Sequence, residues 1–385
     1  MPIYDVAVIG GGIAGVSAAC ELAESGRRVV LLEQEAQLAH HTTGRSAAVY
    51  LESYGPSAVR ALTTASRADF EGAPDRFGTP ALLSARPALW VAPRDQVDAL
   101  QHLLAEVATL QPLAAADAVV RCPALRPDWV VQAAVEDGAA DIDVLALHQG
   151  YVRGLVAASG EIRRSWPVTG LRRVGAAWRV ESASASDDVL EAGAVVLAAG
   201  AWCDPVATLA GARPIGLRPL RRTIAVCRQP AAGALDPHGP LVSDAAHTWY
   251  FKPEGPNLLC SPADESPSQP CDARPEEADV ALAIERVNAA TTLGLRSVIQ
   301  AWAGLRTFAP DRVPVAGEDP SVAGLWWLAG QGGYGIQTAP AMARTLAALM
   351  SEGALPVDVA RSGVVAADLS PARFRSYHGV PPSVG

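Results

Sequence analysis

The chain has 385 residues, half of them hydrophobic, and a formal net charge of -9 at pH 7. This length suggests two domains, and the acidic balance argues against nucleic acid or an anionic membrane as a partner, because both select a basic face. No apolar run approaches the ~20 residues that cross a bilayer, and no basic region precedes the first apolar run, so we expect a cytoplasmic protein without a transmembrane segment.

The six cysteines form no C-x-x-C pair, and no histidine lies at zinc-ligand spacing from them. We therefore expect reduced, mostly buried thiols and no metal site. The adjacent residues His40 and His41 are expected to lie in an exposed loop.

The first thirty-odd residues have the order strand, glycine turn, helix, strand, acid, which is typical of a dinucleotide-binding unit. Gly10 allows a tight turn, Gly12 lets a pyrophosphate approach the backbone, and Gly15 lets the helix pack closely on the strand. The pyrophosphate would lie at the helix amino terminus, where free N–H groups and the helix dipole attract an anion. Gly26 is placed to cap the helix, and Glu33 stands where a carboxylate meets a ribose hydroxyl. The alternative is a tight turn without a ligand, which would not explain why the strand, glycines, helix and acid stand at this spacing.

The small-residue stretch at positions 42–48 has two interpretations. It could cross beside a nucleotide cofactor, because small side chains let backbone amides reach it. It could also be an ordinary helix start with Thr43 or Ser46 as the cap. The sequence alone leaves both open.

Helical and strand patterns alternate between residues 54 and 158. Glycines and prolines at 72–80 are expected to break the first of these helices. His148 is expected to be a hydrogen-bonded side chain on a helix face rather than a catalyst. The expected elements are helices at 54–70, 95–107 and 141–158, a short helix or turn at 113–122, and strands at 82–83, 88–91 and 130–134.

The segment 194–200 is wholly apolar, which predicts a strand buried on both faces in the same parallel sheet as the first strand. Two strands, at 177–181 and 189–192, precede it and are joined by a polar loop at 182–188. Proline content rises between 211 and 300, which together with short strand patterns indicates an antiparallel layer in a second lobe. The pieces are strands at 223–227, 248–252 and 257–260, with a helix at 276–293.

The last third returns to the first domain. An apolar strand at 324–329 leads through the glycine-rich sequence GQGGYG into a helix at 337–350. A second helix amino terminus would thus point at the ligand, and two such ends suit a large, extended cofactor.

Five motifs in this order resemble the FAD-dependent D-amino-acid oxidase (DAO) family over nearly the full length. Within the family, the resemblance is greatest to the bacterial D-arginine dehydrogenases. The motifs are Gly10 to Gly15 with Glu33, TGRSAA at 43–48, AAGAWC at 198–203, WAGLR at 302–306 and GQGGYGIQ at 330–337.

The resemblance implies an α/β fold in which a Rossmann-like FAD-binding domain is interleaved with a mostly antiparallel α+β substrate domain. The expected FAD-binding segments are 1–80, 141–212 and 301–385, and the substrate segments are 81–140 and 213–300. Binding of FAD is expected to be non-covalent, because residues 308–317, where some relatives carry a tethering cysteine, contain none. The residues expected at the cofactor are Gly10, Gly12, Ala14, Gly15, Glu33, Gln34, Thr42, Thr43, Gly44, Arg45, Ser46, Ala47, Ala48, Val168, Gly200, Gly332, Gly333, Tyr334, Gly335, Ile336 and Gln337.

The resemblance also implies a reaction. A D-amino acid loses a hydride from Cα to flavin N5, and water hydrolyses the imino acid to a 2-oxo acid and ammonia. By carry-over, Arg222 and Arg306 would bind the substrate carboxylate. Tyr54 and Tyr250 would add hydroxyls, and the Gly333 carbonyl would take the amino group. Oxygen or a quinone would reoxidise the flavin. The sequence does not tell which of the two is the acceptor, and it does not give the oligomeric state.

The residue types fit these roles, because a guanidinium binds a carboxylate bidentately and so fixes the α-carbon against the flavin. Each also has a structural alternative. Arg306 could form an ion pair at a strand edge, and Arg222 could be one of two adjacent surface arginines. Tyr54 and Tyr250 could be core tyrosines.

The side-chain pocket departs from the arginine-acting relatives. Ala88 stands where those relatives have a glutamate, and Val49 and Leu51 stand where they have a histidine and a threonine. We therefore expect an uncharged, mainly apolar D-amino acid, unless another acid such as Glu52 replaces the glutamate.

Two other functions stay open. A secondary-amine oxidase acting on sarcosine, glycine or an N-methyl amino acid would share the fold and the carboxylate-binding arginine. A non-catalytic or NAD-binding Rossmann module would leave the carboxyl-terminal glycine loop without a purpose.

Overall fold

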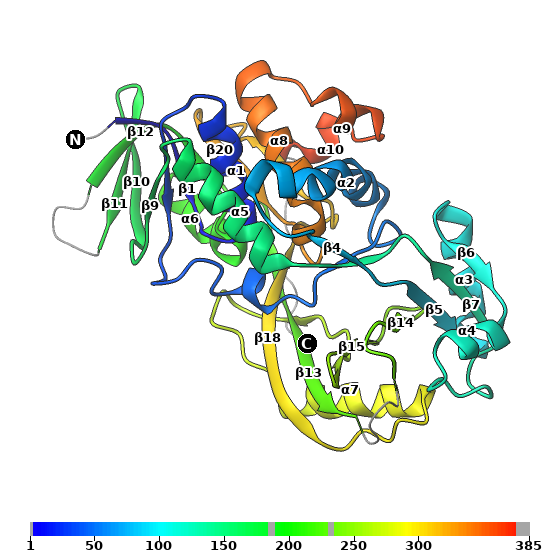
Figure 1. The fold of residues 1–385 in the computed structure, drawn as a ribbon. Helices are drawn as coiled ribbons and strands as arrows, with labels where there is room; N and C mark the ends of the chain where they lie inside the picture. Colours follow the sequence, from blue (N-terminus) through cyan, green and yellow to red (C-terminus); the bar gives the residue numbers. More distant parts are fainter. Residues whose placement is uncertain (1–2, 184–188, 230–234, 375–385) are drawn as a thin grey trace.

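Two β-sheets organise the chain, and each collects strands from distant parts of the sequence (Figure 1). The structure is a computed structural model that describes residues 3–183, 189–229 and 235–374. In the first sheet β1 is parallel to both β2 and β12, as predicted. The order is β10-β11-β12-β1-β2-β9, with β20 also paired to β12 and β19 to β20. The bounds are β1 Ile3–Ile9, β2 Val29–Leu32, β9 Glu161–Arg163, β10 Val168–Val174, β11 Ala177–Ser182, β12 Val189–Leu197, β19 Val315–Glu318 and β20 Leu325–Ala329.

Alternate residues of β1 divide between two cores because successive side chains of a strand point to opposite faces. Val6 and Val8 pack with helices α1, α5 and α8, whereas Ala7 and Ile9 pack on the other face with α6. Across the described ranges no helix combines the length and the apolar character required to cross a bilayer. The bounds are α1 Ile13–Glu24, α2 Ser57–Phe77, α5 Val144–Ala157, α6 Cys203–Leu209, α8 Gly335–Glu352, α9 Val357–Arg361 and α10 Ala366–Leu369.

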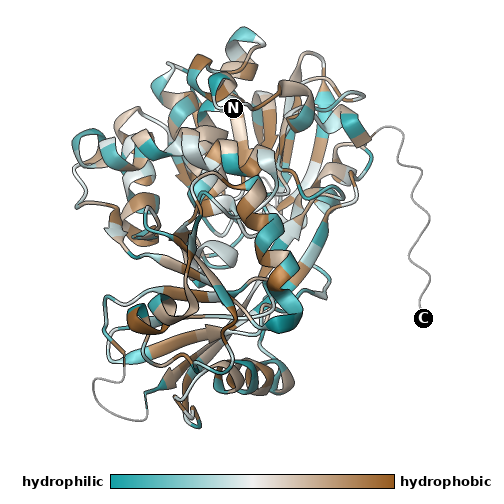
Figure 2. Cartoon of the chain, turned by 90° about the vertical axis from the view of Figure 1, so that its right-hand side faces the viewer, coloured by the Kyte–Doolittle hydropathy of each residue, from teal (hydrophilic) through white to brown (hydrophobic). Residues whose placement is uncertain are grey.

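The second sheet is mostly antiparallel and has the order β17-β13-β16-β15-β14-β5-β7-β6, with β18 paired to β13. Figure 2 shows apolar residues, in brown, along the strands of both parts of the molecule. The predicted domain limits stay a prediction, although β18 runs across the limit at residue 300. The bounds are β5 Ala88–Ala92, β6 Gln111–Leu113, β7 Gln132–Glu136, β13 Arg218–Arg228, β14 Leu241–Asp244, β15 Tyr250–Glu254, β16 Asn257–Ser261, β17 Ser266–Pro267, β18 Val298–Phe308, α3 Val97–Glu106, α4 Ala115–Arg121 and α7 Glu277–Ala290.

A small third sheet, with the order β3-β8-β4, joins the two parts. Its strands are β3 Val49–Tyr50, β4 Leu83–Ala85 and β8 Ala140–Ile142. Strand β3 leads directly into the turn that carries Tyr54, so this sheet fixes where that turn begins.

The predicted break at residues 72–80 is wrong. Helix α2 continues through Gly72 and Pro74 to Phe77. Its inward face, which includes the buried Phe70, outweighs the poor helix propensity of this segment, because tertiary packing commonly overrides propensity. The helix ends at Gly78, whose φ of 61° gives the left-handed cap that glycine favours.

Two other predictions need correction, and a third concerns residues that lie mostly outside the described ranges. Strand β12 is one continuous strand rather than two, and Gly193 within it approaches the carbonyl of Asp5 instead of breaking it. The predicted helix at 141–158 begins only at Val144, because Asp143 caps it by accepting a hydrogen bond from Ala146 N at 2.8 Å. Most of the predicted loop at 182–188, namely residues 184–188, lies outside the described residues.

We expect two helix glycines to respond oppositely to alanine. A Cβ at Gly15 would overlap the carbonyl of Gly10, whereas nothing lies within 4 Å of a Cβ at Gly72. Gly15→Ala should therefore lower the free energy of unfolding by about 1–3 kcal/mol through overpacking. Gly72→Ala should raise it by roughly 0.5–1 kcal/mol through helix propensity. Urea unfolding of both variants measures this, and equal effects would contradict the close approach of α1 to the glycine turn.

Candidate active site

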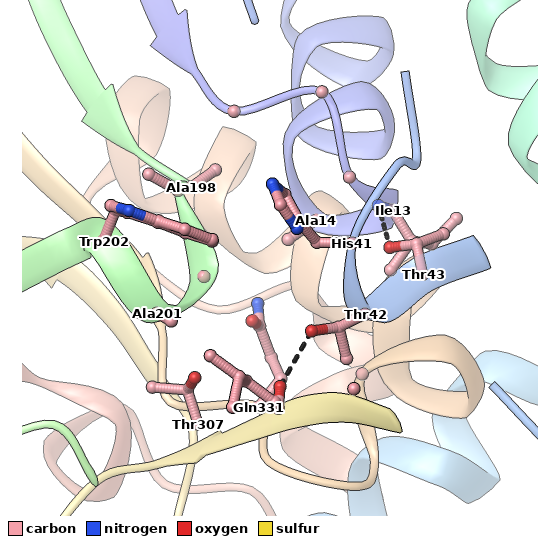
Figure 3. A pocket seen from close by; sticks show the side chains of 18 of the residues that line it. Ile13, Ala14, His41, Thr42, Thr43, Ala198, Ala201, Trp202, Thr307 and Gln331 are labelled. Atoms are coloured by element: carbon pink, nitrogen blue, oxygen red, sulfur yellow. Dashed lines mark hydrogen bonds between the residues drawn. The ribbon is translucent and has the colours of Figure 1, made fainter. Parts of the chain in front are cut away.

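A cavity of about 390 Å³ runs from the amino-terminal glycine turn to the long strands β13 and β18 (Figure 3). Both helix amino termini singled out in the sequence contribute to its wall. Of the predicted cofactor residues, those that line it are Gly10, Gly12, Ala14, Glu33, Gln34, Thr42, Thr43, Arg45, Ser46, Ala47, Val168, Gly200, Gly332, Gly333, Gly335 and Ile336. Arg222 and Arg306 line the same cavity.

The glycine turn has the geometry that the sequence predicts. Gly10 has a φ of 115°, and a Cβ there would overlap the carbonyl of Ala198 on the neighbouring strand. Gly12 is the N-cap of α1, and the amino-terminal residues Gly12, Ile13 and Ala14 line the cavity. The Glu33 carboxylate accepts hydrogen bonds from Gly11 N at 2.6 Å and from Glu35 N at 2.8 Å, which ties the acid to the glycine turn.

Residues 42–45 form a short 3₁₀ helix that crosses beside the cavity. Thr43 Oγ1 accepts a hydrogen bond from Ile13 N at 3.0 Å, and Thr42 Oγ1 donates one to the carbonyl of Leu305 at 2.8 Å (Figure 3). The segment therefore links α1 to β18. Its own N-cap is His41, without a side-chain cap, so the helix-start interpretation with Thr43 or Ser46 as its cap is wrong.

The carboxyl-terminal glycine loop lies against β18. Gly332 has a φ of 52°, and a Cβ there would overlap the ring of Phe308. A Cβ at Gly333 would come within 2.8 Å of Nη1 of Arg306. Only glycine thus lets this loop lie directly on the arginine and then turn into α8.

Five predicted cofactor residues do not line the cavity. Gly15 and Gly44 allow close backbone contacts with Gly10 and Ala39, respectively. Gln337 holds Leu51 and Thr63 by hydrogen bonds. The other two residues are Tyr334, buried against Phe308 and Val59, and Ala48.

Two arginines from paired strands meet at one end of the cavity. Leu220 on β13 lies opposite Arg306 on β18, and Arg222 is two residues further along β13. Arg222 Nε donates to the carbonyl of Asp264 at 2.8 Å, and its Nη2 lies 3.4 Å from Glu265 Oε1. Burial lowers the pKa of Arg222, and the charge of Arg306 lowers it further.

Tyr54 lies beside this pair. Arg306 Nη1 donates a hydrogen bond to the Tyr54 hydroxyl at 3.0 Å. Burial acts to raise the pKa of Tyr54, but Arg306 and Arg222 outweigh it and hold that pKa below its usual value. In the described part of the chain no carboxylate lies within 4 Å of the Arg306 guanidinium, so this cation has a phenol but no counter-ion.

The predicted side-chain pocket residues come together. Val49, Leu51 and Ala88 pack with Tyr54 and Tyr250 in one apolar cluster, which also contains Ala139 and Leu241. The Tyr250 hydroxyl is buried and has no hydrogen-bond partner among the described residues. None of these five residues lines the cofactor cavity. The cluster is therefore packed beside the arginine pair and leaves one hydroxyl unpaired.

Sequence patterns missed several residues at this end. His247, with a φ of 55°, lies in the turn between β14 and β15 with its ring centroid 5.8 Å from Tyr54 and 4.7 Å from Trp90. Burial lowers the pKa of His247, and Arg222 lowers it further. Glu265 binds Arg312 through two hydrogen bonds of 2.6 and 2.9 Å. No motif marks these positions, because only the strand pairing brings them to the site.

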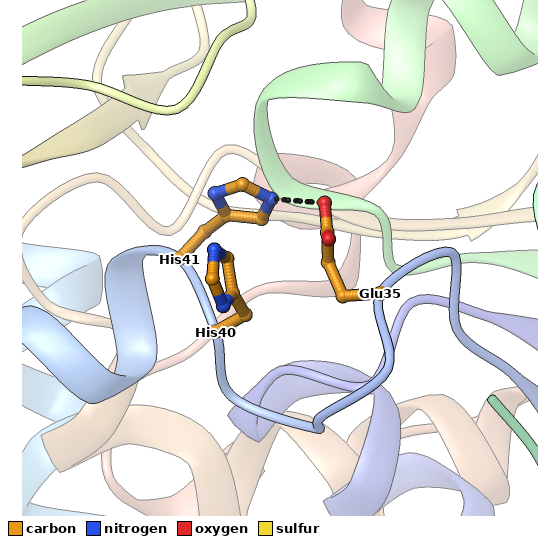
Figure 4. Close-up of side chains that lie close together, drawn as sticks. All are labelled: Glu35, His40 and His41. Atoms are coloured by element: carbon orange, nitrogen blue, oxygen red, sulfur yellow. Dashed lines mark hydrogen bonds and ion pairs between the residues drawn. The ribbon is translucent and has the colours of Figure 1, made fainter. Parts of the chain in front are cut away.

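Glu35, His40 and His41 form a side-chain cluster (Figure 4), and the two histidines line the cavity. One ligand atom from each lies within 4.8 Å of the others, but His41 Nε2 is already 3.0 Å from Glu35 Oε1. His40 is exposed, as expected. The His41 ring instead packs on Trp202 with centroids 4.6 Å apart and is half-buried.

Three buried polar atoms along the cavity have no hydrogen-bond partner among the described residues. They are His41 Nδ1, Trp166 Nε1 and Thr307 Oγ1. Buried polar groups are normally paired, so these atoms indicate a polar ligand along the cavity.

The comparison with protein families decides the family. A family model described as "FAD dependent oxidoreductase" (DAO) matches residues 5–349. The chain belongs to the DAO family. Its cofactor is therefore FAD, and the long cavity, the two helix amino termini and the unpaired polar atoms fit this ligand.

Individual proteins resemble the chain at identities of 34% or less. The chain is 34% identical over 187 residues to FAD-dependent oxidoreductase domain-containing protein 1 of Bos taurus, a match that covers 43% of this chain and 37% of that protein. It is 28% identical over 372 residues to the glycine oxidase of Pseudomonas aeruginosa, covering 90% and 94%. The L-proline dehydrogenase structure from P. horikoshii superposes with a TM-score of 0.82 at 18% identity, covering 96% and 97%.

We expect all of the FAD to be held without a covalent bond, because residues 308–317 contain no cysteine. Acid precipitation of the purified protein should leave all the yellow colour in the supernatant. Colour in the pellet would contradict this, and His40 and His41, which line the cavity, would then be substituted first.

Proposed function

We propose that the protein oxidises a small D-amino acid with an uncharged, mainly apolar side chain. Cα loses a hydride and the amino nitrogen loses a proton, so that a C=N bond forms. Water then adds to this imino acid, and ammonia leaves to give a 2-oxo acid. Bound FAD supplies the two-electron acceptor, which oxygen or a quinone would reoxidise.

The observation that carries this proposal is the position of Arg306. Its guanidinium lines the cofactor cavity, binds the Tyr54 hydroxyl and lacks a carboxylate partner within the described ranges. A partly buried cation without a counter-ion favours an anionic ligand, and a guanidinium binds a carboxylate in a fixed bidentate geometry. Arg222 adds a second cation, and the Gly333 carbonyl, in the loop that lines the cavity, would take the amino group. These contacts would hold Cα toward the cofactor, and such positioning is a large part of what hydride transfer requires.

The carboxylates around the apolar cluster support an uncharged side chain. Glu52 accepts from the Tyr50 hydroxyl at 2.8 Å and lies 3.6 Å from Arg67. Asp141 pairs with Arg86 and with Lys252, whose Nζ lies 2.8 Å away. Glu52 is therefore engaged elsewhere, and the Glu136 carboxylate, opposite Ala88 in register, already accepts from the N–H groups of Glu52 and Ser53. A substrate guanidinium beside Ala88 would stay unpaired, at a cost of several kcal/mol.

A second candidate function is the oxidation of glycine, sarcosine or another N-substituted amino acid. The favouring observation is the glycine oxidase relative, which aligns along 90% of this chain. Both functions use the same carboxylate contact, and they differ in the volume that the apolar cluster must hold.

Arg306→Ala should reduce kcat/KM by roughly 30-fold or more while FAD stays bound. The reason is that removing one partner of a desolvated charge pair typically costs about 2–5 kcal/mol. The matched control is Arg221→Ala, because Arg221 faces Glu276 and Asp279 rather than the cavity. Steady-state kinetics and flavin content measure the outcome. If Arg306→Ala keeps bound flavin and near-full activity, Arg306 does not bind the substrate carboxylate.

Uncharged, apolar D-amino acids should be oxidised with a higher kcat/KM than D-arginine and D-lysine, because each buried methylene contributes about 0.8 kcal/mol. Ala88→Glu should shift the preference toward D-arginine by ~1–3 kcal/mol if position 88 faces the substrate side chain. A panel of D- and L-amino acids, glycine, sarcosine and proline, run with a dye acceptor and with oxygen alone, measures both points. A wild-type preference for D-arginine, or an unchanged ranking in the variant, would overturn the assignment, and a preference for sarcosine or glycine would support the second candidate.

A further inference from the structure

Glu136 is a buried carboxylate without a cationic partner in the described part of the chain. It ends strand β7, is 2% exposed and lies directly opposite Ala88 of β5. Its oxygens accept hydrogen bonds from Glu52 N at 2.6 Å, from Ser53 N at 3.3 Å and from the Ser53 hydroxyl. Every one of these donors belongs to a single turn at residues 51–54.

This turn connects the apolar cluster to the arginine pair. Gln337 holds its first residue, because the Leu51 N–H and carbonyl both bond the Gln337 side chain at 3.2 Å. Glu136 holds the middle of the turn. The last residue is Tyr54, whose hydroxyl accepts from Arg306 at 3.0 Å. Gln337 and Glu136 thus hold the backbone of residues 51–53. The position of this backbone determines where the Tyr54 hydroxyl lies.

A carboxylate at this place is costly unless it has a role. Burial raises the pKa of Glu136, the donors of Ser53 and Glu52 lower it, and the charge of the Glu52 side chain raises it again. Replacing a buried charged group by an apolar one of similar shape is often neutral or stabilising. The residue is better explained by the geometry that it imposes than by net stability.

We propose that Glu136 is a positioning residue that holds the 51–54 turn, and with it Tyr54, in place for binding of the substrate carboxylate. The proposal rests on the proposed function of the arginine pair. Glu136 acts through the Tyr54 turn and contacts neither the cavity nor the arginines. This role also explains why the Glu136 carboxylate, although opposite Ala88 in register, is not available to a basic substrate.

The test compares Glu136→Gln with the control Glu52→Gln in the FAD-loaded protein. The Glu52 carboxylate faces Tyr50 and Arg67, so its loss should leave the turn in place. Hydrogen exchange of the Glu52 and Ser53 amides should accelerate at least tenfold in Glu136→Gln. Ser53→Ala, which removes one donor and leaves the carboxylate, should show a smaller increase. This variant keeps the test valid if Glu136→Gln does not fold.

Ligand binding gives the second readout. Benzoate, a carboxylate without an amino group, is titrated against the flavin absorbance. Its Kd should rise on the order of tenfold in Glu136→Gln, a change typical of losing one positioned hydrogen bond to a charged group. In turnover, KM should rise more than kcat falls.

A double-mutant cycle with Tyr54→Phe decides whether the effect passes through Tyr54. The effect of Glu136→Gln on benzoate binding should largely disappear in the Tyr54→Phe background, because coupled residues are not additive. Additive effects, or unchanged amide exchange and Kd in Glu136→Gln, would overturn the proposal. If Arg306→Ala leaves benzoate binding intact, the proposed function fails instead, and amide exchange still reports on the turn.

Discussion

The site depends on holding two guanidinium groups close together in a partly buried space. Burial and the charge of Arg306 lower the pKa of Arg222. Burial also acts to lower the pKa of Arg306, but Tyr54 and Tyr250 outweigh it and raise that pKa. Arg222 has the Asp264 carbonyl and Glu265, while Arg306 has the Tyr54 hydroxyl. Because Arg306 keeps no carboxylate of its own within the described ranges, an anion is needed to complete its environment.

The long antiparallel pair β13 and β18 meets this constraint. Ten registered residue pairs fix the two strands along their length, so that side chains on their inner face keep a constant spacing. A loop could not hold two like charges in this way, since their repulsion would separate them. The same strand pair brings Gly304 against the 42–45 helix and Phe308 against the glycine loop, so it also positions the cofactor cavity.

Sequence reasoning located the parts of the site that depend on local backbone chemistry. The turn at Gly10, the contact at Gly15 and the loop at Gly332 and Gly333 each need glycine for a close approach, and such needs appear in the sequence as motifs. The resemblance named Arg222, Arg306 and Tyr54. Glu136, His247 and Glu265 could not be found, because their roles arise from strand pairing between segments far apart in the chain. The helix break at 72–80 was wrongly predicted because burial of the inward face of α2 outweighed the local helix propensity.

In the proposed function, substrate preference depends on where the nearby acids are fixed and not on how many there are. Glu52, Glu136 and Asp141 all lie near the apolar cluster, yet each accepts hydrogen bonds from other groups. A carboxylate that already binds two backbone amides gains little from a substrate cation and would lose the geometry that it imposes. Glu136, on β7 opposite Ala88 of β5, is occupied in this way by the N–H groups of Glu52 and Ser53. The cluster around Ala88 is therefore apolar although three carboxylates lie near it.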